Sequence, residues 1–417
     1  MRVLWITNIV FPSIAEQLGM PKVVVGGWMY SAAKSLIEED PTLQLAVATV
    51  YPGDTFVDQE LDGIRYFILP LKGASNLKYN KSLEKYWRDI NDAFAPDCVH
   101  LHGTEYAHGL AFLRACPNVR TVASIQGIVS SYARYYLAGL TTCDIIKSLT
   151  LRDVLRGTIW AGKRSFEKRG RLEIEIVNRL QHIIGRTSWD KAHVLAINPT
   201  IQYHFCNETL RPEFYGKTWT YEECEKHSIF VSQANYPIKG LHQLLKAMPL
   251  ILDRYPDTKI YVAGADVAKM KGLRQKVCQT GYGRYVAKLI KQYHLEDKVF
   301  FTGSLSAEQM CRRYLASNVF VSASAIENSP NSLGEAQLLG VPCLASYVGG
   351  TMDMMAGDEE HLYRFEEVEM LAIKVCEIFA NCRTVDVAMQ QQAMARHDAH
   401  RNTMALLSIY ENLLSDH

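Results

Sequence analysis

The chain has 417 residues, a formal net charge of +1, and 48% hydrophobic against 21% charged residues. That length favours two domains, and the near-neutral charge provides no general field for binding nucleic acid. The ten scattered cysteines include no CxxC pair, which indicates reduced thiols rather than a zinc or disulfide framework.

The N-terminal segment "MRVLWITNIVF" is interpreted as a buried strand, because no small-residue cleavage site of a signal peptide follows it. In the first half, apolar runs alternate with amphipathic ones. Strands are predicted at 2–10, 44–52, 97–103 and 120–127, and helices at 26–39 and 82–94. Near-continuous apolar strands between helices are typical of a parallel sheet covered on both faces.

The second half repeats this alternation. Strands are predicted at 228–234, 258–265, 298–304, 318–324 and 341–347, with helices at 240–255 and about 268–294, 306–316 and 332–340. The expected fold class is α/β, with two Rossmann-like doubly wound domains facing a central cleft. We expect the domains to span 1–204 and 205–397, with a C-terminal helix at about 398–417 packing back on the first. Ligands of such sheets bind beyond the carboxyl ends of the strands.

The segment "SAIENSPNSLGEAQLLGVP" (324–342) places Glu327 after a predicted strand and Glu335 inside a predicted helix. The helix is expected to begin at about Asn331 or Ser332, because proline is tolerated at a helix start and Asn and Ser are good caps. A helix start with exposed N–H groups suits a pyrophosphate, and the two acids suit hydroxyls on either side of it. The alternative is a capping acid and an unrelated surface acid.

Two further loops suit phosphate binding. Lys239 lies at a loop-to-helix junction, where it adds a cation to a positive helix start. Gly26 and Gly27 precede the first predicted helix and would let a phosphate approach the backbone. A solvated lysine and a flexible turn are the alternatives. The first strand is not followed by GxGxxG, which counts against a nicotinamide or flavin enzyme.

Polar residues also follow the strands of the first half. His100 and His102 share one face of a strand, without a third metal ligand nearby in sequence, so packing or hydrogen bonding is favoured over metal binding. Gln126 and Arg186 each follow a predicted strand. Arg186 can bind an anion or form a plain salt bridge.

A basic stretch, 147–171, carries eight Lys or Arg and two acidic residues, with apolar and aromatic residues between them. Such a helix can lie on an anionic membrane surface, or it can be a solvated face of the N-terminal domain.

Together these loops resemble the GT-B retaining glycosyltransferases of the family-4 type, the glycosyl transferases of group 1. The resemblance rests on the Glu-x7-Glu pair followed by "EAQLLGVP" and on "YPIKGLHQLL" (236–245), with weaker support from "PDCVHLHG" (96–103), Gly26-Gly27 and "VGG" (348–350). It implies a nucleoside-diphosphate sugar as donor, bound by the C-terminal domain, and an acceptor on the N-terminal side.

By position, the resemblance implies that Lys239 neutralises the donor diphosphate, Glu327 contacts the sugar and Glu335 the ribose. The backbone of Asn331, Ser332 and Leu333 would bind sugar and phosphate, and Gly27 would approach the diphosphate. Two positions depart from the family. Gln233 replaces an arginine, which removes one charge that Arg186 would have to replace, and Gln126 replaces a histidine and cannot be a general base. His102, Gln126 and Arg186 are the candidates for positioning the acceptor or sugar.

The function expected is a retaining hexosyltransferase-type glycosyltransferase in polysaccharide or glycolipid biosynthesis. Lys239 and Glu327 would be its catalytic residues, and no metal or other cofactor is expected. The expected partners are the donor and a saccharide or lipid-linked acceptor, without nucleic acid. The expected location is cytoplasmic, with 147–171 against the inner membrane face. The alternatives are a nucleotide-sugar epimerase and a non-catalytic nucleotide-sugar-binding protein.

Overall fold

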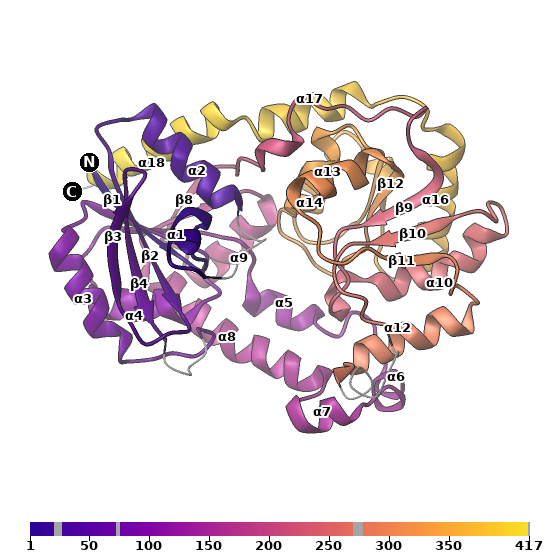
Figure 1. Ribbon diagram of the computed structural model, residues 1–417, viewed down its shortest axis with the longest axis horizontal. Coiled ribbons are helices and arrows are strands. Elements are labelled where there is room, and N and C mark those ends of the chain that lie inside the picture. Colours follow the sequence, from indigo (N-terminus) through magenta and orange to yellow (C-terminus); the bar gives the residue numbers. More distant parts are fainter. Residues whose placement is uncertain (21–26, 72–75, 270–277, 416–417) are drawn as a thin grey trace. The chain divides into compact units, whose positions relative to one another are not determined.

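The computed structural model describes residues 1–20, 27–71, 76–269 and 278–415. The chain forms two compact units (Figure 1). Unit 1 comprises Met1–Ser131, Phe166–Arg211 and Arg396–His417, and unit 2 comprises Tyr132–Ser165 and Pro212–Ala395. This division differs from the expected one: the boundary follows residue 211 rather than 204, and residues 132–165 belong to unit 2.

Unit 1 contains an eight-stranded sheet with the order β3-β4-β2-β1-β5-β6-β7-β8. Its strands are β1 (Arg2–Thr7), β2 (Gln44–Tyr51), β3 (Val57–Leu61), β4 (Ile64–Pro70), β5 (Cys98–His102), β6 (Thr121–Ser124), β7 (His182–Gly185) and β8 (Gln202–Phe205). All neighbouring pairs are parallel except β3 and β4. The strand order reverses between β1 and β5, as in a doubly wound sheet.

Helices cover both faces of this sheet. Its helices are α1 (Pro12–Gln17), α2 (Gly27–Glu39), α3 (Leu83–Phe94), α4 (Ala107–Ala115), α9 (Ser188–Ile197) and α18 (Ala399–Ser415), while α5 (Val129–Tyr135) and α8 (Ile159–Arg179) belong partly to each unit. Alternate residues of β1 enter opposite cores: Leu4 packs with α3 and α4, and Trp5 packs with α2 and α18. Trp5 also donates a hydrogen bond to Tyr410 of α18, with a distance of 2.9 Å. This period-two burial is what a sheet covered on both faces requires.

The antiparallel hairpin β3–β4 was not anticipated from the sequence. Its two-residue turn, Asp62-Gly63, has positive φ at both positions, 54° and 75°. An Asp-Gly pair between strands is a typical hairpin signal, so the information was present in the sequence.

Unit 2 contains a six-stranded parallel sheet with the order β11-β10-β9-β12-β13-β14. Its strands are β9 (Glu225–Val231), β10 (Lys259–Val262), β11 (Val299–Phe301), β12 (Ser317–Ser322), β13 (Cys343–Ser346) and β14 (Leu362–Tyr363). Its helices are α6 (Thr142–Lys147), α7 (Leu151–Arg156), α10 (Leu241–Leu252), α12 (Gly281–Gln292), α13 (Ala307–Leu315), α14 (Asn331–Leu338), α15 (Thr351–Met354), α16 (Val368–Asn381) and α17 (Val387–Arg396), with short 3-10 turns η1 (Pro212–Phe214), η2 (Pro237–Lys239) and η3 (Glu359–His361). The expectation of two Rossmann-like α/β domains with parallel sheets is thus confirmed.

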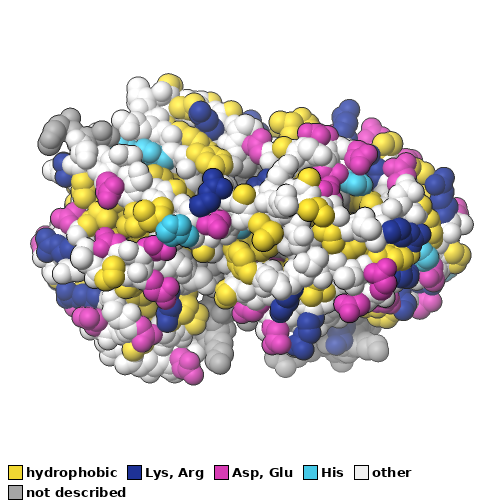
Figure 2. Space-filling view, turned by 90° about the horizontal axis from the view of Figure 1, so that it is seen from above, with side chains coloured by type: hydrophobic (Ala, Val, Ile, Leu, Met, Phe, Trp, Pro, Cys, Tyr) yellow, Lys and Arg dark blue, Asp and Glu magenta, His cyan; other side chains and the backbone are white. Residues whose placement is uncertain are grey.

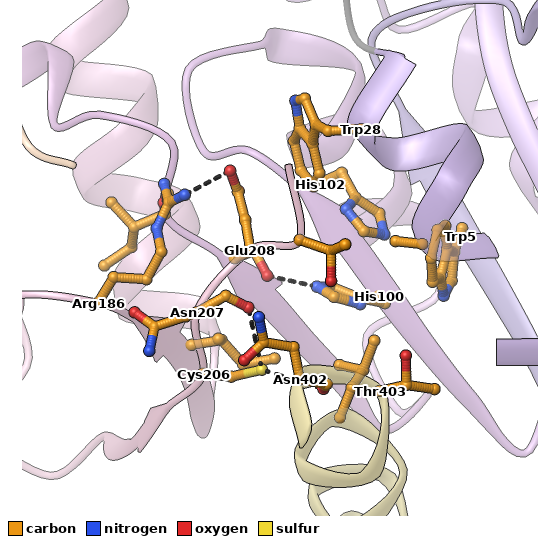
Figure 3. Close-up of a pocket in the computed structure, with 16 residues that line it drawn as sticks. Trp5, Trp28, His100, His102, Arg186, Cys206, Asn207, Glu208, Asn402 and Thr403 are labelled. Atoms are coloured by element: carbon orange, nitrogen blue, oxygen red, sulfur yellow. Dashed lines mark hydrogen bonds and ion pairs between the residues drawn. The ribbon is translucent and has the colours of Figure 1, made fainter. Parts of the chain in front are cut away.

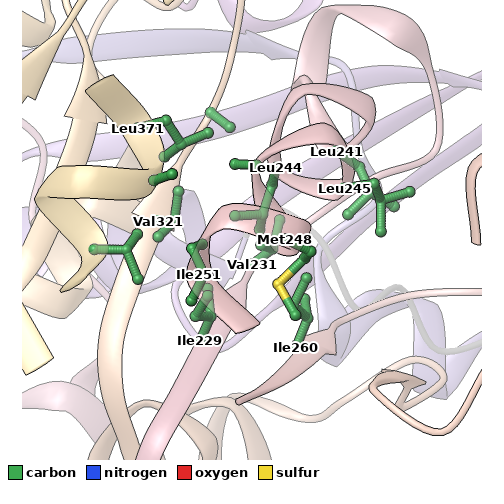
Figure 4. Packing of buried hydrophobic residues seen from close by; sticks show 14 of the residues in the cluster. Ile229, Val231, Leu241, Leu244, Leu245, Met248, Ile251, Ile260, Val321 and Leu371 are labelled. Carbon is green, nitrogen blue, oxygen red and sulfur yellow. The ribbon is translucent and has the colours of Figure 1, made fainter. Parts of the chain in front are cut away.

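The core of unit 2 forms where α10, α12 and α16 pack on one face of this sheet. Figure 4 shows Leu244 and Met248 of α10 among Ile229, Ile260 and Val321 of the strands. On the opposite face, Phe230 and Phe320 pack against Tyr314 of α13. Burial on both faces fixes the strands firmly, so the loops at their carboxyl ends have a rigid base.

Helix α12, which begins at Gly281, covers the later part of the helix expected at about 268–294. Residues 270–277 of that expected range lie outside the described part of the chain. Thr280 caps the helix by accepting a hydrogen bond from the Gly283 amide, 3.0 Å away. Threonine is one of the residues preferred at the N-cap of a helix.

The distribution of charged side chains on the surface is consistent with the near-neutral net charge. On the face shown in Figure 2, Lys and Arg side chains lie among Asp and Glu side chains. Among the described residues, no helix is long and apolar enough to cross a membrane.

Candidate functional site

In unit 2, the candidate site lies where the strand order reverses. β10 and β11 lie on one side of β9, and β12, β13 and β14 lie on the other. Loops that leave β9 and β12 therefore diverge from neighbouring strand ends, which is where doubly wound sheets bind their ligands. Lys239 follows β9, and Glu327 follows β12.

The structure brings these two residues together as an ion pair. Lys239 Nζ lies 2.6 Å from Glu327 Oε1, and the side chains are 20% and 10% exposed. Ser324 Oγ donates a second hydrogen bond to Glu327 Oε1, at 2.7 Å. Burial alone would lower the pKa of Lys239, but the charge of Glu327 outweighs it and raises that pKa above its usual 10.5. Lys239 therefore stays protonated at neutral pH.

Backbone contacts between the two loops hold this pair in place. The Ala325 amide donates to the Ile238 carbonyl oxygen, 2.7 Å away. Gly240, with φ of 69°, packs so closely that a Cβ atom there would overlap the Ala323 carbonyl oxygen. Only glycine meets both requirements. This is why a glycine follows Lys239.

The "VGG" segment has a similar role on the other side of Glu327. The Gly350 amide donates to the Glu327 carbonyl oxygen, 3.0 Å away. Gly349 has φ of 53°, and a Cβ atom there would overlap the same oxygen. The glycines therefore allow a close backbone approach that positions Glu327.

Helix α14 begins at Asn331, as the sequence predicted, and its N-cap residue, Pro330, makes no side-chain cap hydrogen bond. Asn331 and Ser332 are partly exposed, whereas Leu333 and Glu335 are buried. The Leu333 amide donates to the Pro330 carbonyl oxygen at 2.9 Å. Of the three expected backbone donors, Leu333 is thus already engaged. Gln233 is partly buried in the loop after β9.

In unit 1, a pocket lies at the carboxyl ends of β5 to β8 and is closed by α2 and α18 (Figure 3). Trp5, Trp28, His102, Arg186 and Glu208 are among its lining residues. Gly27 begins α2, and among the described residues its Cβ position would meet Arg211, at an ordinary contact distance of 3.9 Å. Gly26 lies outside the described residues.

The two histidines of β5 differ in their hydrogen bonding. His100 contacts Tyr410 Oη through Nδ1 and Ser124 Oγ through Nε2, both at 2.6 Å. His102 stacks on His100 with ring centroids 3.9 Å apart, and its two buried ring nitrogens have no hydrogen-bond partner among the described residues. Burial lowers the pKa of His100 to about 3 and that of His102 well below 6.5. Both rings are therefore neutral, and His102 can hydrogen-bond a ligand.

Gln126 and Arg186 both contact the carboxylate of Glu208, a residue that was not among those predicted for the site. Arg186 Nη1 lies 2.5 Å from Glu208 Oε2, with side-chain exposures of 4% and 10%. Gln126 Nε2 donates to Glu208 Oε1 at 2.7 Å. Glu208 follows β8, a strand that was not among those predicted, so its position at a strand end was missed. Arg186 thus already has a buried counter-charge.

Asp358, Glu360 and His361 are grouped closely enough to hold a metal ion. His361 Nδ1, however, contacts Asp358 Oδ1 at 2.5 Å. Burial alone would lower the pKa of His361, but Asp358 raises it to about 10. A protonated histidine is no metal ligand, so the ion pair competes with metal binding.

Residues 218–393, which lie within unit 2, match the family model described as "Glycosyl transferases group 1". An uncharacterized glycosyltransferase of Methanocaldococcus jannaschii is 28% identical over 134 residues, which is 32% of this chain and 30% of that protein. The aligned segment thus spans about a third of either chain.

Similar solved structures cover the whole chain. Sucrose-phosphate synthase from Thermosynechococcus elongatus has a TM-score of 0.71 at 18% identity and covers 99% of both chains. The Anabaena protein HepE, solved with UDP-glucose, has a TM-score of 0.63 at 15% identity, covering 99% of this chain and 100% of that one. These likenesses show the fold, which is the two-domain GT-B architecture of glycosyltransferases.

Proposed function

We propose that the protein is a glycosyltransferase, which moves a sugar from a nucleoside diphosphate to an acceptor hydroxyl with retention of configuration. The observation that carries this is the Lys239–Glu327 ion pair. Two loops hold it where the strand order reverses, inside the segment that matches the glycosyltransferase family.

The donor diphosphate would lie between Lys239 and the start of α14. An ammonium group has three donors, so Lys239 can keep Glu327 and still reach a phosphate oxygen. The amides of Asn331 and Ser332 and the positive end of the helix add further attraction for an anion. Leu333 is not proposed to contact the donor, because its side chain is fully buried and its amide already donates to the Pro330 carbonyl oxygen.

Glu327 would orient the sugar through its hydroxyls, and Glu335 would accept from the ribose. Gln233 contributes a neutral contact, which leaves Lys239 as the charged side chain proposed for the diphosphate. The similar structure of HepE, solved with UDP-glucose, supports a nucleotide-sugar donor.

In the proposed reaction, the bond between the anomeric carbon and the diphosphate oxygen breaks as the acceptor oxygen bonds that carbon from the same face. The acceptor proton passes to the departing diphosphate. Lys239 and the helix start stabilise the charge that develops there, and Glu327 fixes the sugar. This mechanism requires no general base, which is consistent with glutamine at position 126.

The acceptor would occupy the pocket of unit 1. Trp28 offers an aromatic face to a sugar ring, and the unpartnered nitrogens of His102 can bond a hydroxyl. Glu208, held by Arg186 and Gln126, can also accept from hydroxyls. We propose a saccharide or lipid-linked acceptor on the cytoplasmic side, in polysaccharide or glycolipid synthesis. Trp28→Ala should then raise KM for the acceptor more than KM for the donor.

A direct test measures transfer and donor hydrolysis over a set of nucleotide sugars, with NMR of the product anomer. Lys239→Ala and Glu327→Gln should each lower kcat by about 100-fold or more. Lys259→Ala is the control, because Lys259 also pairs with a glutamate, Glu225, at 2.8 Å, but on the surface. Inversion at the anomeric carbon would contradict retention. An isomerised sugar without acceptor would favour an epimerase, and binding without turnover a non-catalytic protein.

A further inference from the structure

A surface of unit 2 outside the Lys239–Glu327 site combines exposed apolar residues with a cationic groove. The apolar residues are Ile146, Leu151, Val154 and Leu155, which are 55%, 60%, 76% and 72% exposed. Single exposed apolar side chains are common, but four of this exposure within one short segment indicate a contact surface. We call it the α6–α7–α12 surface, after the helices that form it.

Helix α7 is reversed relative to an ordinary surface helix: its polar side packs against the protein. Thr150 and Asp153 are only 8% and 4% exposed. Thr150 Oγ1 donates to the Gln279 carbonyl oxygen at 2.8 Å, and Asp153 Oδ1 accepts from the Gly281 amide at 3.1 Å. The same two residues form the capping box of α7. These hydrogen bonds hold the apolar side of α7 outward, opposite to the usual amphipathic arrangement.

Beside this apolar side lies a groove of about 490 Å³, between α7 and α12. Lys147, Arg284, Lys288 and Lys291 line it, and none of the described residues that line it is acidic. The last three recur at i, i+4 and i+7 and therefore share one face of α12. This groove suits an anion of headgroup size.

Two acids, Asp144 of α6 and Asp153 of α7, lie near this groove, and Asp144 interacts electrostatically with Lys288, so it offsets part of the groove's charge. Asp144 Oδ2 accepts from the Thr141 amide at 3.1 Å and from its hydroxyl at 2.7 Å. Asp153 bonds Thr150 and Gly281 as described above. Arg284 Nη1 donates to the Leu149 carbonyl oxygen at 2.6 Å, which fixes α12 beside α7.

We propose that the α6–α7–α12 surface docks unit 2 on an anionic membrane. The apolar residues would enter the boundary between headgroups and acyl chains, while a lipid phosphate occupies the groove. Adjacent apolar and cationic surfaces complement a lipid interface, whereas nucleic acid offers phosphates without apolar area beside them. The site differs from the basic stretch expected at 147–171, because three of its four cations come from α12.

The test uses the full chain and vesicles of phosphatidylcholine, alone or mixed with phosphatidylglycerol. The wild type should sediment with the mixed vesicles and be released by salt. Val154→Ser/Leu155→Ser and Lys288→Gln/Lys291→Gln should each weaken binding about tenfold or more. Donor hydrolysis in solution should be unchanged in both, which separates this proposal from that of the active site.

Matched controls remove equally exposed groups elsewhere in unit 2. Val387→Ser/Met394→Ser replaces apolar residues that are 58% and 56% exposed. Arg312→Gln/Arg364→Gln removes two exposed charges. Both controls should bind like the wild type, and thermal unfolding should show that every variant is folded.

Four outcomes would overturn the proposal. In the first, the wild type does not bind the mixed vesicles. In the second, the control variants lose as much vesicle binding as the test variants. In the third, the chain would self-associate without binding vesicles, and Val154→Ser/Leu155→Ser would abolish that association, which would assign the surface to a second copy. Retention of inorganic phosphate without vesicle binding would count against the membrane in the same way.

Discussion

Gly240 and Ala323 meet backbone to backbone at the base of the Lys239–Glu327 pair. The first is the N-cap residue of α10 and the second follows β12, and no space remains between them for a Cβ atom at position 240. The ion pair between the Lys239 ammonium group and the Glu327 carboxylate therefore depends on Gly240, which contacts neither of these groups.

Gly240→Ala should lower the free energy of unfolding by about 2–4 kcal/mol, because it adds a backbone clash to the cost of positive φ. Gly216→Ala is the matched control: Gly216 has φ of 70° but no atom within 4 Å of its Cβ position. It should lose only about 1 kcal/mol. Urea unfolding of both variants measures the difference. Equal losses would show that the close approach to Ala323 is unimportant.

Glu327→Leu should destabilise the protein by about 2–4 kcal/mol, because it leaves the charge of Lys239 largely buried and unpaired. Lys239→Met/Glu327→Leu should recover more than half of this loss, since the double variant leaves no charge behind. Chemical unfolding of the wild type, Glu327→Leu, Lys239→Met and the double variant tests the pair without reference to activity. A double variant as unstable as the sum of its parts would refute the coupling.

The stabilisation that the Lys239–Glu327 pair provides should depend on pH, and the raised pKa of Lys239 determines the direction. The pKa of Lys239 is raised above its ordinary 10.5, so the stabilisation is fully present below pH 10.5 and is lost as pH rises through the folded value. The stability advantage of the wild type over Lys239→Met/Glu327→Leu, which has no titrating group at either position, should therefore stay constant from pH 7 to about 10 and shrink only above that. An advantage that shrinks below pH 9 would contradict this.

Glu208→Leu should cost about 3–5 kcal/mol of unfolding free energy, because Arg186 is only 4% exposed and would lose its counter-charge. Arg186→Met/Glu208→Leu should be much closer to the wild type. If the pocket of unit 1 binds the acceptor, the double variant should be folded yet have a raised acceptor KM. Calorimetry and steady-state kinetics give the two readouts.

Glu105 should make folding less favourable as pH rises. Burial raises its pKa to about 7 from an ordinary 4.5, so the folded state holds a proton that the unfolded state has released between these values. The contribution of Glu105 to the free energy of unfolding therefore falls by at most about 3 kcal/mol between pH 4.5 and 7, and is constant above pH 7. Glu105→Gln should gain stability relative to the wild type across that window, measured by urea unfolding at several pH values. A difference independent of pH would refute the shift.

Much of the architecture could be predicted from local patterns. Apolar runs located β1, β2, β5, β6 and most strands of unit 2, and the start of α14 followed from Pro330 and Asn331. The missed elements have weaker periodicity. β3 has only partly exposed or exposed residues, so no apolar run marks it in the sequence.

The site was predictable residue by residue but not as an arrangement. Lys239 and Glu327 were expected to contact different parts of one ligand, whereas the structure pairs them with each other. Glu208 was missed because its strand, β8, is short and largely polar. The outward apolar side of α7 was hidden as well, because the sequence shows that a helix has two faces but not which one the protein covers.

The sequence by itself determined the alternation of strands and helices and the chemical nature of the loops, because both depend on neighbours within a few residues. Only the tertiary structure decided that residues 239 and 327, separated by 88 positions, share one ion pair. It also decided that Glu208 joins Gln126 to Arg186. Such contacts depend on the order of strands in the sheet, and strand order is fixed by packing across the whole domain rather than by any local pattern.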